Sequence, residues 1–170
     1  MNEENKTSKM TVGLFSSRTE EWETPQYVYD KLNEEFNFDI DVCATSKNAK
    51  APFYYTKDTD GLKQDWCPYQ TCFMNPPYGK EIGKWMEKAY RESATCTVVC
   101  LVHARTDTRW WHDWAMKASE IRFIKGRLKF GHGKQSAPFP SCIIIFRPSD
   151  NQTNIYNVPK IETLIFNKLK

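Results

Sequence analysis

The spacing of apolar residues predicts helices that alternate with strands along the chain. Val28, Leu32 and Phe36 recur at every fourth position after Thr24-Pro25, which predicts a helix with Thr24 as its N-cap and Pro25 in its first turn. Further amphipathic helices are expected over residues 80–93, 108–118 and about 160–170. Residues 1–20 are polar and lack periodicity, so we expect them to form a flexible arm.

Strands are predicted where apolar residues alternate with polar ones or form continuous runs. Residues 38–42 alternate with a period of two, whereas residues 96–102 and 142–146 are apolar throughout, as in strands that are buried on both faces. Shorter strands are expected at residues 53–55, 71–74 and 120–124. The alternation predicts an α/β fold with a mostly parallel sheet, and such sheets bind ligands beyond the carboxyl ends of their strands.

The composition fits a single globular domain, which we expect to span residues 21–170. The chain has 170 residues, of which 40% are hydrophobic and 26% are charged, and one domain typically holds about 150 residues. The N-terminus shows no apolar signal segment, and no apolar run reaches the roughly 18 residues of a membrane span. These features predict a cytoplasmic protein without a membrane partner.

The six cysteines favour buried thiols over a metal site. Cys67-x4-Cys72 and Cys96-x3-Cys100 lack the ligand spacing of a zinc finger, so no metal is expected. The net charge of +3 and the aromatic content of 14% agree with nucleic-acid binding but indicate it only weakly.

The motif Asn75-Pro76-Pro77-Tyr78 follows directly on the predicted strand at residues 71–74. Two prolines cannot continue a central strand, so the strand ends there and the motif lies at the ligand-binding edge of the sheet. The alternative is a rigid turn without function, because short motifs recur by chance. The position of the motif directly after an apolar strand favours a functional site.

These residue types suit methylation of an amino group on a planar ring. Adenine N6 is a poor nucleophile because its lone pair is delocalised into the ring. Hydrogen bonds from its two hydrogens to the side-chain oxygen of Asn75 and the backbone oxygen of Pro76 would free that lone pair. Tyr78 offers a flat face for an extruded base. No covalent nucleophile is needed, because positioning and charge stabilisation supply the rate.

Several motifs in a fixed order make the chain resemble a known family. From about Trp22 to Phe146, it resembles the phage-type, Dam-like DNA N6-adenine methyltransferases. The motifs that carry the resemblance are Trp22-Glu23-Thr24-Pro25, residues 38–44, Asp60-Gly61-Leu62, Asp65-Trp66, residues 75–79, residues 101–108 and residues 126–130.

The resemblance implies a Rossmann-like methyltransferase fold with an antiparallel strand near the C-terminus. It implies S-adenosylmethionine as the methyl donor and a flipped adenine of double-stranded DNA as the acceptor, in a bacterial cell or a phage-infected host. No obligate protein partner is evident. The runner-up substrates are an RNA adenine and a protein glutamine, for which the motif chemistry is the same. A non-catalytic nucleic-acid-binding protein that kept the fold is a further alternative, which the intact motif disfavours.

The resemblance also implies cofactor-binding residues, which are Trp22, Thr24, Pro25, Asp41, Ala44, Asp65 and Trp66. Asp41 would lie near the amino-acid part of the cofactor, and Asp65 and Trp66 near its adenine. The chain has Cys43-Ala44 where many methyltransferases have a Gly-x-Gly loop. The alternatives are that Trp22 and Trp66 are core residues and that Asp41 caps a helix.

Basic residues in two segments are candidates for contacts with DNA. The first segment follows the strand at residues 96–102, and the second is a glycine-containing loop at about residues 125–138. The candidates are Arg105, Arg109, Arg127, Lys129, Phe130 and Lys134. Phe130 would provide a second stacking face for the flipped base. Solvated surface charge is the alternative for the basic residues, and core packing is favoured for Trp110 and Trp111.

Overall fold

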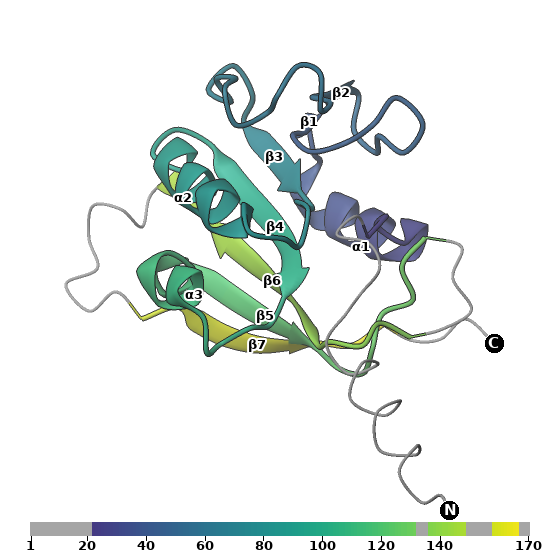
Figure 1. Ribbon diagram of the computed structural model, residues 1–170, viewed down its shortest axis with the longest axis vertical. Coiled ribbons are helices and arrows are strands. Elements are labelled where there is room, and N and C mark those ends of the chain that lie inside the picture. Colours follow the sequence, from purple (N-terminus) through teal and green to yellow (C-terminus); the bar gives the residue numbers. More distant parts are fainter. Residues whose placement is uncertain (1–21, 132–135, 149–157, 167–170) are drawn as a thin grey trace, which may run out of the picture.

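The computed structural model describes residues 22–131, 136–148 and 158–166, which form a three-layer α/β structure (Figure 1). The helices are α1 (Gln26–Phe36), α2 (Ile82–Glu92) and α3 (Arg109–Asp113), and a short 3-10 helix follows at Ala115–Lys117. The strands are β1 (Ile40–Asp41), β2 (Phe53–Tyr54), β3 (Thr71–Met74), β4 (Thr97–His103), β5 (Glu120–Ile124), β6 (Ser141–Phe146) and β7 (Lys160–Leu164).

The seven strands form one mixed sheet in the order β2-β1-β3-β4-β6-β5-β7. β6 runs antiparallel to both of its neighbours, β4 and β5, while the other pairs are parallel. The predicted α/β class with a mostly parallel sheet is therefore confirmed, and β6 is the antiparallel strand that the resemblance implied near the C-terminus.

The two faces of the sheet have separate hydrophobic cores. The first core lies under α2 and α3 and contains Trp85, Met86 and Trp111. The second lies under α1 and contains Val28, Tyr29 and Leu32. Figure 1 shows α2 and α3 on one side of the sheet and α1 on the other. The strands β4 and β6 contribute to both cores, which explains their uninterrupted apolar sequences.

The predicted C-terminal helix over about residues 160–170 is wrong for the part that the structure describes. Residues 160–164 form β7, which pairs in parallel with β5. The sequence Lys160-Ile161-Glu162-Thr163-Leu164 also alternates with a period of two. An isolated short helix is only marginally stable, whereas β5 offers an open row of backbone hydrogen-bonding groups, so strand pairing prevails.

The predicted start of the first helix is also wrong in detail. α1 begins at Gln26 with Pro25 as its N-cap, and no side chain caps it. Thr24 instead accepts a hydrogen bond from Asn75. The helix expected over residues 108–118 is shorter, because α3 ends at Asp113 and the chain continues as a 3-10 turn.

Candidate active site

Asn75 follows directly after β3, and only the nitrogen of its side-chain amide has hydrogen-bond partners among the described residues. Asn75 Nδ2 donates hydrogen bonds to the backbone oxygen of Trp22 and, at 2.9 Å, to Thr24 Oγ1. A carbonyl oxygen accepts but never donates, so the nitrogen of the amide must face Trp22. Asn75 Oδ1 is then turned away, and it is buried without a hydrogen-bond partner in the part of the chain that the structure describes. A buried acceptor left open in this way is available to a ligand.

A cavity of about 790 Å³, here called the motif pocket, lies beyond the carboxyl ends of β1 and β3. It brings together Asn75, Pro76 and Pro77 of the motif with four of the predicted cofactor-binding residues, Trp22, Thr24, Asp41 and Ala44. These residues come from segments more than 50 positions apart in sequence. The volume lies within the range of about 300–1,000 Å³ that is usual for small-molecule sites.

Asp41 is the buried carboxyl group of the motif pocket. Its side chain accepts hydrogen bonds from the backbone nitrogens of Cys43 and Lys50, both at 3.3 Å. Burial raises the pKa of Asp41 to about 6, and these hydrogen bonds and the charge of Lys50 oppose the rise only in part. The carboxylate is ionised at neutral pH and available to a cationic group. Asp41 does not cap a helix, because the residues that follow β1 form bends and turns.

Asp65 and Trp66 do not line the motif pocket. Trp66 is fully buried, donates a hydrogen bond from Nε1 to the backbone oxygen of Gly61 at 2.9 Å, and lies 6.5 Å from the ring of Trp85. Trp66 is thus a core residue that supports the pocket wall, since Gly61 and Trp85 do line the pocket. Asp65 is exposed and accepts a hydrogen bond from Cys67. Pro25, which is buried, follows Thr24 at the start of α1.

The pocket also contains residues that the sequence analysis had not assigned to cofactor binding. They lie in the loops after β1 and β2 and in α2, and include Thr45, Asn48, Thr56, Lys57, Asp60, Gly61 and Trp85. A Cβ atom on Gly61 would lie 2.3 Å from the backbone oxygen of Val42, so only glycine fits there. The motif Asp60-Gly61 was the available signal, because glycine marks the close approach of two backbone segments.

Tyr78 points away from the motif pocket into a cluster of aromatic rings. Its hydroxyl donates a hydrogen bond to the backbone oxygen of Leu101 at 3.1 Å. Its ring centroid lies 4.8 Å from that of His103, 5.4 Å from that of Phe139 and 6.2 Å from that of Phe130. Phe130 is buried and also packs against Trp22. The two predicted stacking residues are therefore close together, and Phe139 contacts both of them.

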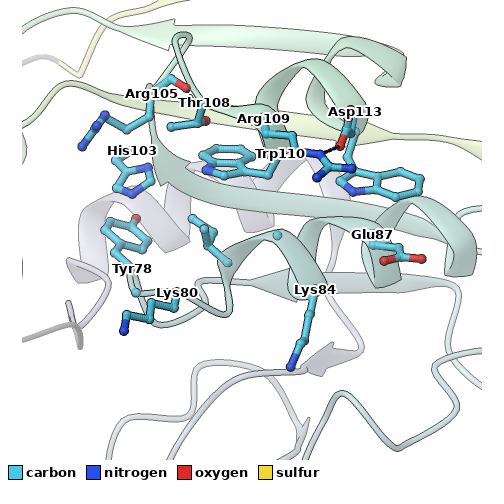
Figure 2. A pocket seen from close by; sticks show the side chains of 14 residues that line it. Tyr78, Lys80, Lys84, Glu87, His103, Arg105, Thr108, Arg109, Trp110 and Asp113 are labelled. Atoms are coloured by element: carbon cyan, nitrogen blue, oxygen red, sulfur yellow. Dashed lines mark hydrogen bonds and ion pairs between the residues drawn. The ribbon is translucent and has the colours of Figure 1, made fainter.

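A second hollow of about 690 Å³, here called the α2–α3 cleft, lies beside Tyr78 (Figure 2). Two of the predicted DNA-binding residues, Arg105 and Arg109, line it. Gly79 lines both this cleft and the motif pocket, so the two hollows meet at the end of the motif. Trp110 and Trp111 are buried, which agrees with their interpretation as core residues.

The other predicted DNA-binding residues lie elsewhere. In the segment after β5, exposed and buried side chains alternate. Arg127 and Lys129 are exposed, and Leu128 and Phe130 are buried. Lys134 lies outside the described residues, as do the N-terminal arm (residues 1–20) and part of the loop expected at 125–138.

The cysteines largely follow the thiol interpretation. Four of the six are buried, and Cys67 is exposed. Asp65, Cys67 and Glu92 bring three potential ligand atoms within 4.8 Å of one another, but Lys88 already pairs with Glu92 at 2.6 Å. We assign this group no function. Across the residues that the structure describes, every helix is too short or too polar to cross a membrane.

Comparisons with known proteins match most of the chain. The model of a family described as DNA N-6-adenine-methyltransferase (Dam) matches residues 13–164. A protein of Escherichia phage T1 named DNA N-6-adenine-methyltransferase is 27% identical over 109 residues. That match covers 63% of the present chain and 45% of the phage protein, so the chain aligns with less than half of that relative.

Proposed function

This chain belongs to the Dam family of DNA N-6-adenine-methyltransferases, and from that premise we propose that it transfers a methyl group from S-adenosylmethionine to N6 of a flipped adenine in double-stranded DNA. One observation carries the proposal, namely the open, buried Asn75 Oδ1 at the end of β3. A Rossmann-like methyltransferase fold is part of the proposal, and the antiparallel β6 between β4 and β5 supports it.

The catalytic part of the proposal concerns the acceptor amino group. Asn75 Oδ1 accepts one N6 hydrogen and the backbone oxygen of Pro76 accepts the other, which localises the nitrogen lone pair. Pro77 keeps the turn rigid, and Tyr78 contributes a ring face to the base. Thr24 and the backbone of Trp22 hold the amide of Asn75 in the orientation that presents its oxygen. The methylated nitrogen carries a positive charge and then loses one proton to solvent water.

The residues of the motif pocket fit S-adenosylmethionine. The pocket has a suitable volume, the buried carboxylate of Asp41, and an indole nitrogen of Trp22 that is buried without a partner among the described residues. A bound S-adenosylmethionine supplies an electrophilic methyl group on a positively charged sulfur. Trp22, Thr24, Asp41 and Ala44 would hold it, with Asp41 facing its cationic amino-acid part.

The DNA-binding part of the proposal assigns Arg105, Arg109, Arg127, Lys129 and Lys134 to the phosphate backbone. Phe130 is assigned to the wall of the base site together with Tyr78, to which it lies close. Because Phe130 is buried in the DNA-free chain, the base would contact it only after the aromatic cluster around Phe139 has opened.

A transfer assay with radiolabelled S-adenosylmethionine tests the proposal on duplex DNA, RNA and protein. We expect label in DNA, and hydrolysis of that DNA to nucleosides should give N6-methyldeoxyadenosine. Label in RNA or protein with none in DNA would contradict it. Direct sequencing of DNA from cells that express the protein would then identify the methylated sequence.

A further inference from the structure

The α2–α3 cleft is lined by more positive charge than the sequence had indicated. In addition to Arg105 and Arg109, Lys80 and Lys84 line it from the segment that leads into α2 and from α2 itself (Figure 2). Lys80 has no carboxylate partner in the described part of the chain, whereas the other three cations pair with nearby acids at 2.6–3.3 Å. Exposed pairs of this kind contribute little energy, so a phosphate group can replace the acids.

The inner end of the cleft has an unsatisfied polar group. His103, the last residue of β4, packs between the rings of Tyr78 and Trp110, whose centroids lie 4.8 Å and 5.6 Å from its own. Its Nδ1 is buried and has no hydrogen-bond partner in the described residues. Burial lowers the pKa of His103, so the ring is neutral at pH 7 and offers one donor and one acceptor. A group of this kind can bond to the edge of a base.

We propose that the α2–α3 cleft binds the DNA nucleotide next to the target adenine, with Lys80 and Arg105 at the two phosphates that flank this nucleotide and His103 at the edge of its base. The inference rests on the proposed function, because it takes the adenine to lie at Asn75. Gly79 lines both hollows, so a strand that places one base at Asn75 passes its neighbour directly into the cleft. The cleft volume of about 690 Å³ suits a ligand of small-molecule size.

Equilibrium binding to a duplex oligonucleotide at several salt concentrations tests the phosphate contacts. The double variant Lys80→Ala/Arg105→Ala should bind about ten-fold more weakly for each phosphate interaction that it removes. Its log Kd should also depend less steeply on log salt, by about two in slope, because each neutralised phosphate contributes about one. The matched control is Lys31→Ala/Lys160→Ala, which removes two exposed cations from α1 and β7. Equal salt slopes for the two double variants would overturn the proposal.

His103→Phe tests the base contact, since it keeps a ring between Tyr78 and Trp110 and removes the polar nitrogens. We expect a changed distribution of bases beside the methylated adenine, read by direct sequencing of methylated DNA. His103→Asn, which restores a donor and an acceptor, should shift the distribution differently. Melting temperature and S-adenosylmethionine binding establish that each variant is folded. An unchanged distribution in both variants would contradict the assignment of His103.

These outcomes separate the inference from the proposed function. If the wild type binds DNA through the cleft but transfers no methyl group, the proposed function is wrong, and only the phosphate contacts of the cleft stand. If the wild type methylates DNA and the Lys80/Arg105 variant behaves like its control, the inference and the assignment of Arg105 are wrong, and the proposed methyl transfer stands. Cleft-dependent binding of an RNA strand in preference to DNA would also overturn the inference.

Discussion

At the scale of single residues, the site depends on the orientation of one amide. The two acceptors of Asn75 Nδ2 come from the segment before α1, 51 and 53 positions away in sequence. Turning the amide over would place its oxygen against the carbonyl of Trp22, which is electrostatically unfavourable. The open side of Asn75 is therefore an acceptor, as methylation of an amino group requires, and the segment at Trp22–Thr24 is what determines it.

Replacing Asn75 should separate chemistry from cofactor binding. Asn75→Ala removes the acceptor for the N6 hydrogen, and we expect kcat to fall by about 10²-fold or more, as when one oxyanion-hole donor is removed. The Kd of S-adenosylmethionine should change little, as isothermal calorimetry would measure. Thr24→Ala should lower kcat less, and Thr24→Ser, which keeps the hydroxyl acceptor, should restore it. Wild-type turnover by Asn75→Ala would contradict the mechanism.

Replacing Asp41 should stabilise the fold and weaken cofactor binding. Burial raises the pKa of Asp41 from 3.8 to about 6. An acid with a raised pKa destabilises the folded state when ionised, and this cost disappears as the pH falls from about 6 to the unfolded value. Asp41→Asn should therefore raise the free energy of unfolding by up to about 3 kcal/mol near pH 8, since one pKa unit is worth about 1.4 kcal/mol.

The pH dependence provides the control for Asp41→Asn. Thermal melts should converge for variant and wild type below about pH 3, because the carboxyl group is protonated in both states only well below its unfolded pKa of 3.8. S-adenosylmethionine binding by the wild type should weaken as the pH falls through about 6, and binding by the variant should not follow this profile. A pH-independent difference in melting temperature would mean that the charge of Asp41 is not responsible.

At the scale of elements, the loops after β1 and β2 form the motif pocket because they approach each other closely. Gly61 lies against the backbone of Val42, and Trp66 holds the carbonyl of Gly61 from the core side. Trp85 of α2 stacks on Trp66 and lines the pocket. The strands β1 and β2 have only two residues each and therefore make few backbone hydrogen bonds. Side-chain packing positions the loops that follow them.

Replacing Gly61 with alanine should disrupt the close contact between the loops after β1 and β2. The Cβ of the alanine would lie 2.3 Å from the Val42 oxygen, and we expect Gly61→Ala to cost about 1–3 kcal/mol and to weaken cofactor binding. The matched control is Gly83→Ala in α2. The added Cβ atom would lie 3.5 Å from Cβ of Trp110, which is an ordinary van der Waals distance. That variant should be neutral or stabilising by up to about 1 kcal/mol. Urea denaturation would measure the free energy of unfolding of both variants. Equal values for the two would contradict the prediction and would show that the loop moves to accommodate the methyl group.

At the scale of the whole molecule, a network of charges joins α1 to β5 and to the end of β6. Arg122 of β5 contacts both carboxylate oxygens of Glu35 in α1, at 2.6 and 2.7 Å, and Glu120 at 2.6 Å. Glu120 also accepts a hydrogen bond from Arg147, which follows β6. The network connects the antiparallel part of the sheet with the helix that begins beside the motif pocket.

Glu120→Gln should destabilise the protein by about 1.5–3 kcal/mol, because it weakens charged hydrogen bonds to Arg122 and Arg147, while Glu35 still compensates the charge of Arg122. Burial raises the pKa of Glu120, but Arg122 and Arg147 outweigh burial, and the pKa is lowered from 4.5. The stabilisation is thus present above the unfolded pKa and is lost as the pH falls below it. Glu87→Gln, which breaks only an exposed pair with Arg91, should cost about 0.5 kcal/mol or less. Chemical denaturation at neutral and acidic pH would compare the two.

Local patterns predicted the elements well wherever the pattern had one interpretation. The runs of β4 and β6 were found nearly to the residue, because strands that are buried on both faces have few polar positions. The strands β3 and β5 were also found, although β5 carries the polar residues Glu120 and Arg122. The last strand, β7, was missed because residues 160–164 are too few to distinguish the period of a strand from the period of a helix. Its pairing with β5 involves residues 40 positions away, which no local pattern contains.

The order of apolar runs was enough to establish the class of the fold, and two prolines that end a strand were enough to place the motif at the end of β3. Which residues meet there depended on the folded chain. Folding joined Trp22, Thr24 and Asp41 to Asn75, placed Trp66 in the core, and opened a basic cleft beside Tyr78. Burial and hydrogen-bond partners depend on segments that are distant in sequence, whereas periodicity reports only on neighbours.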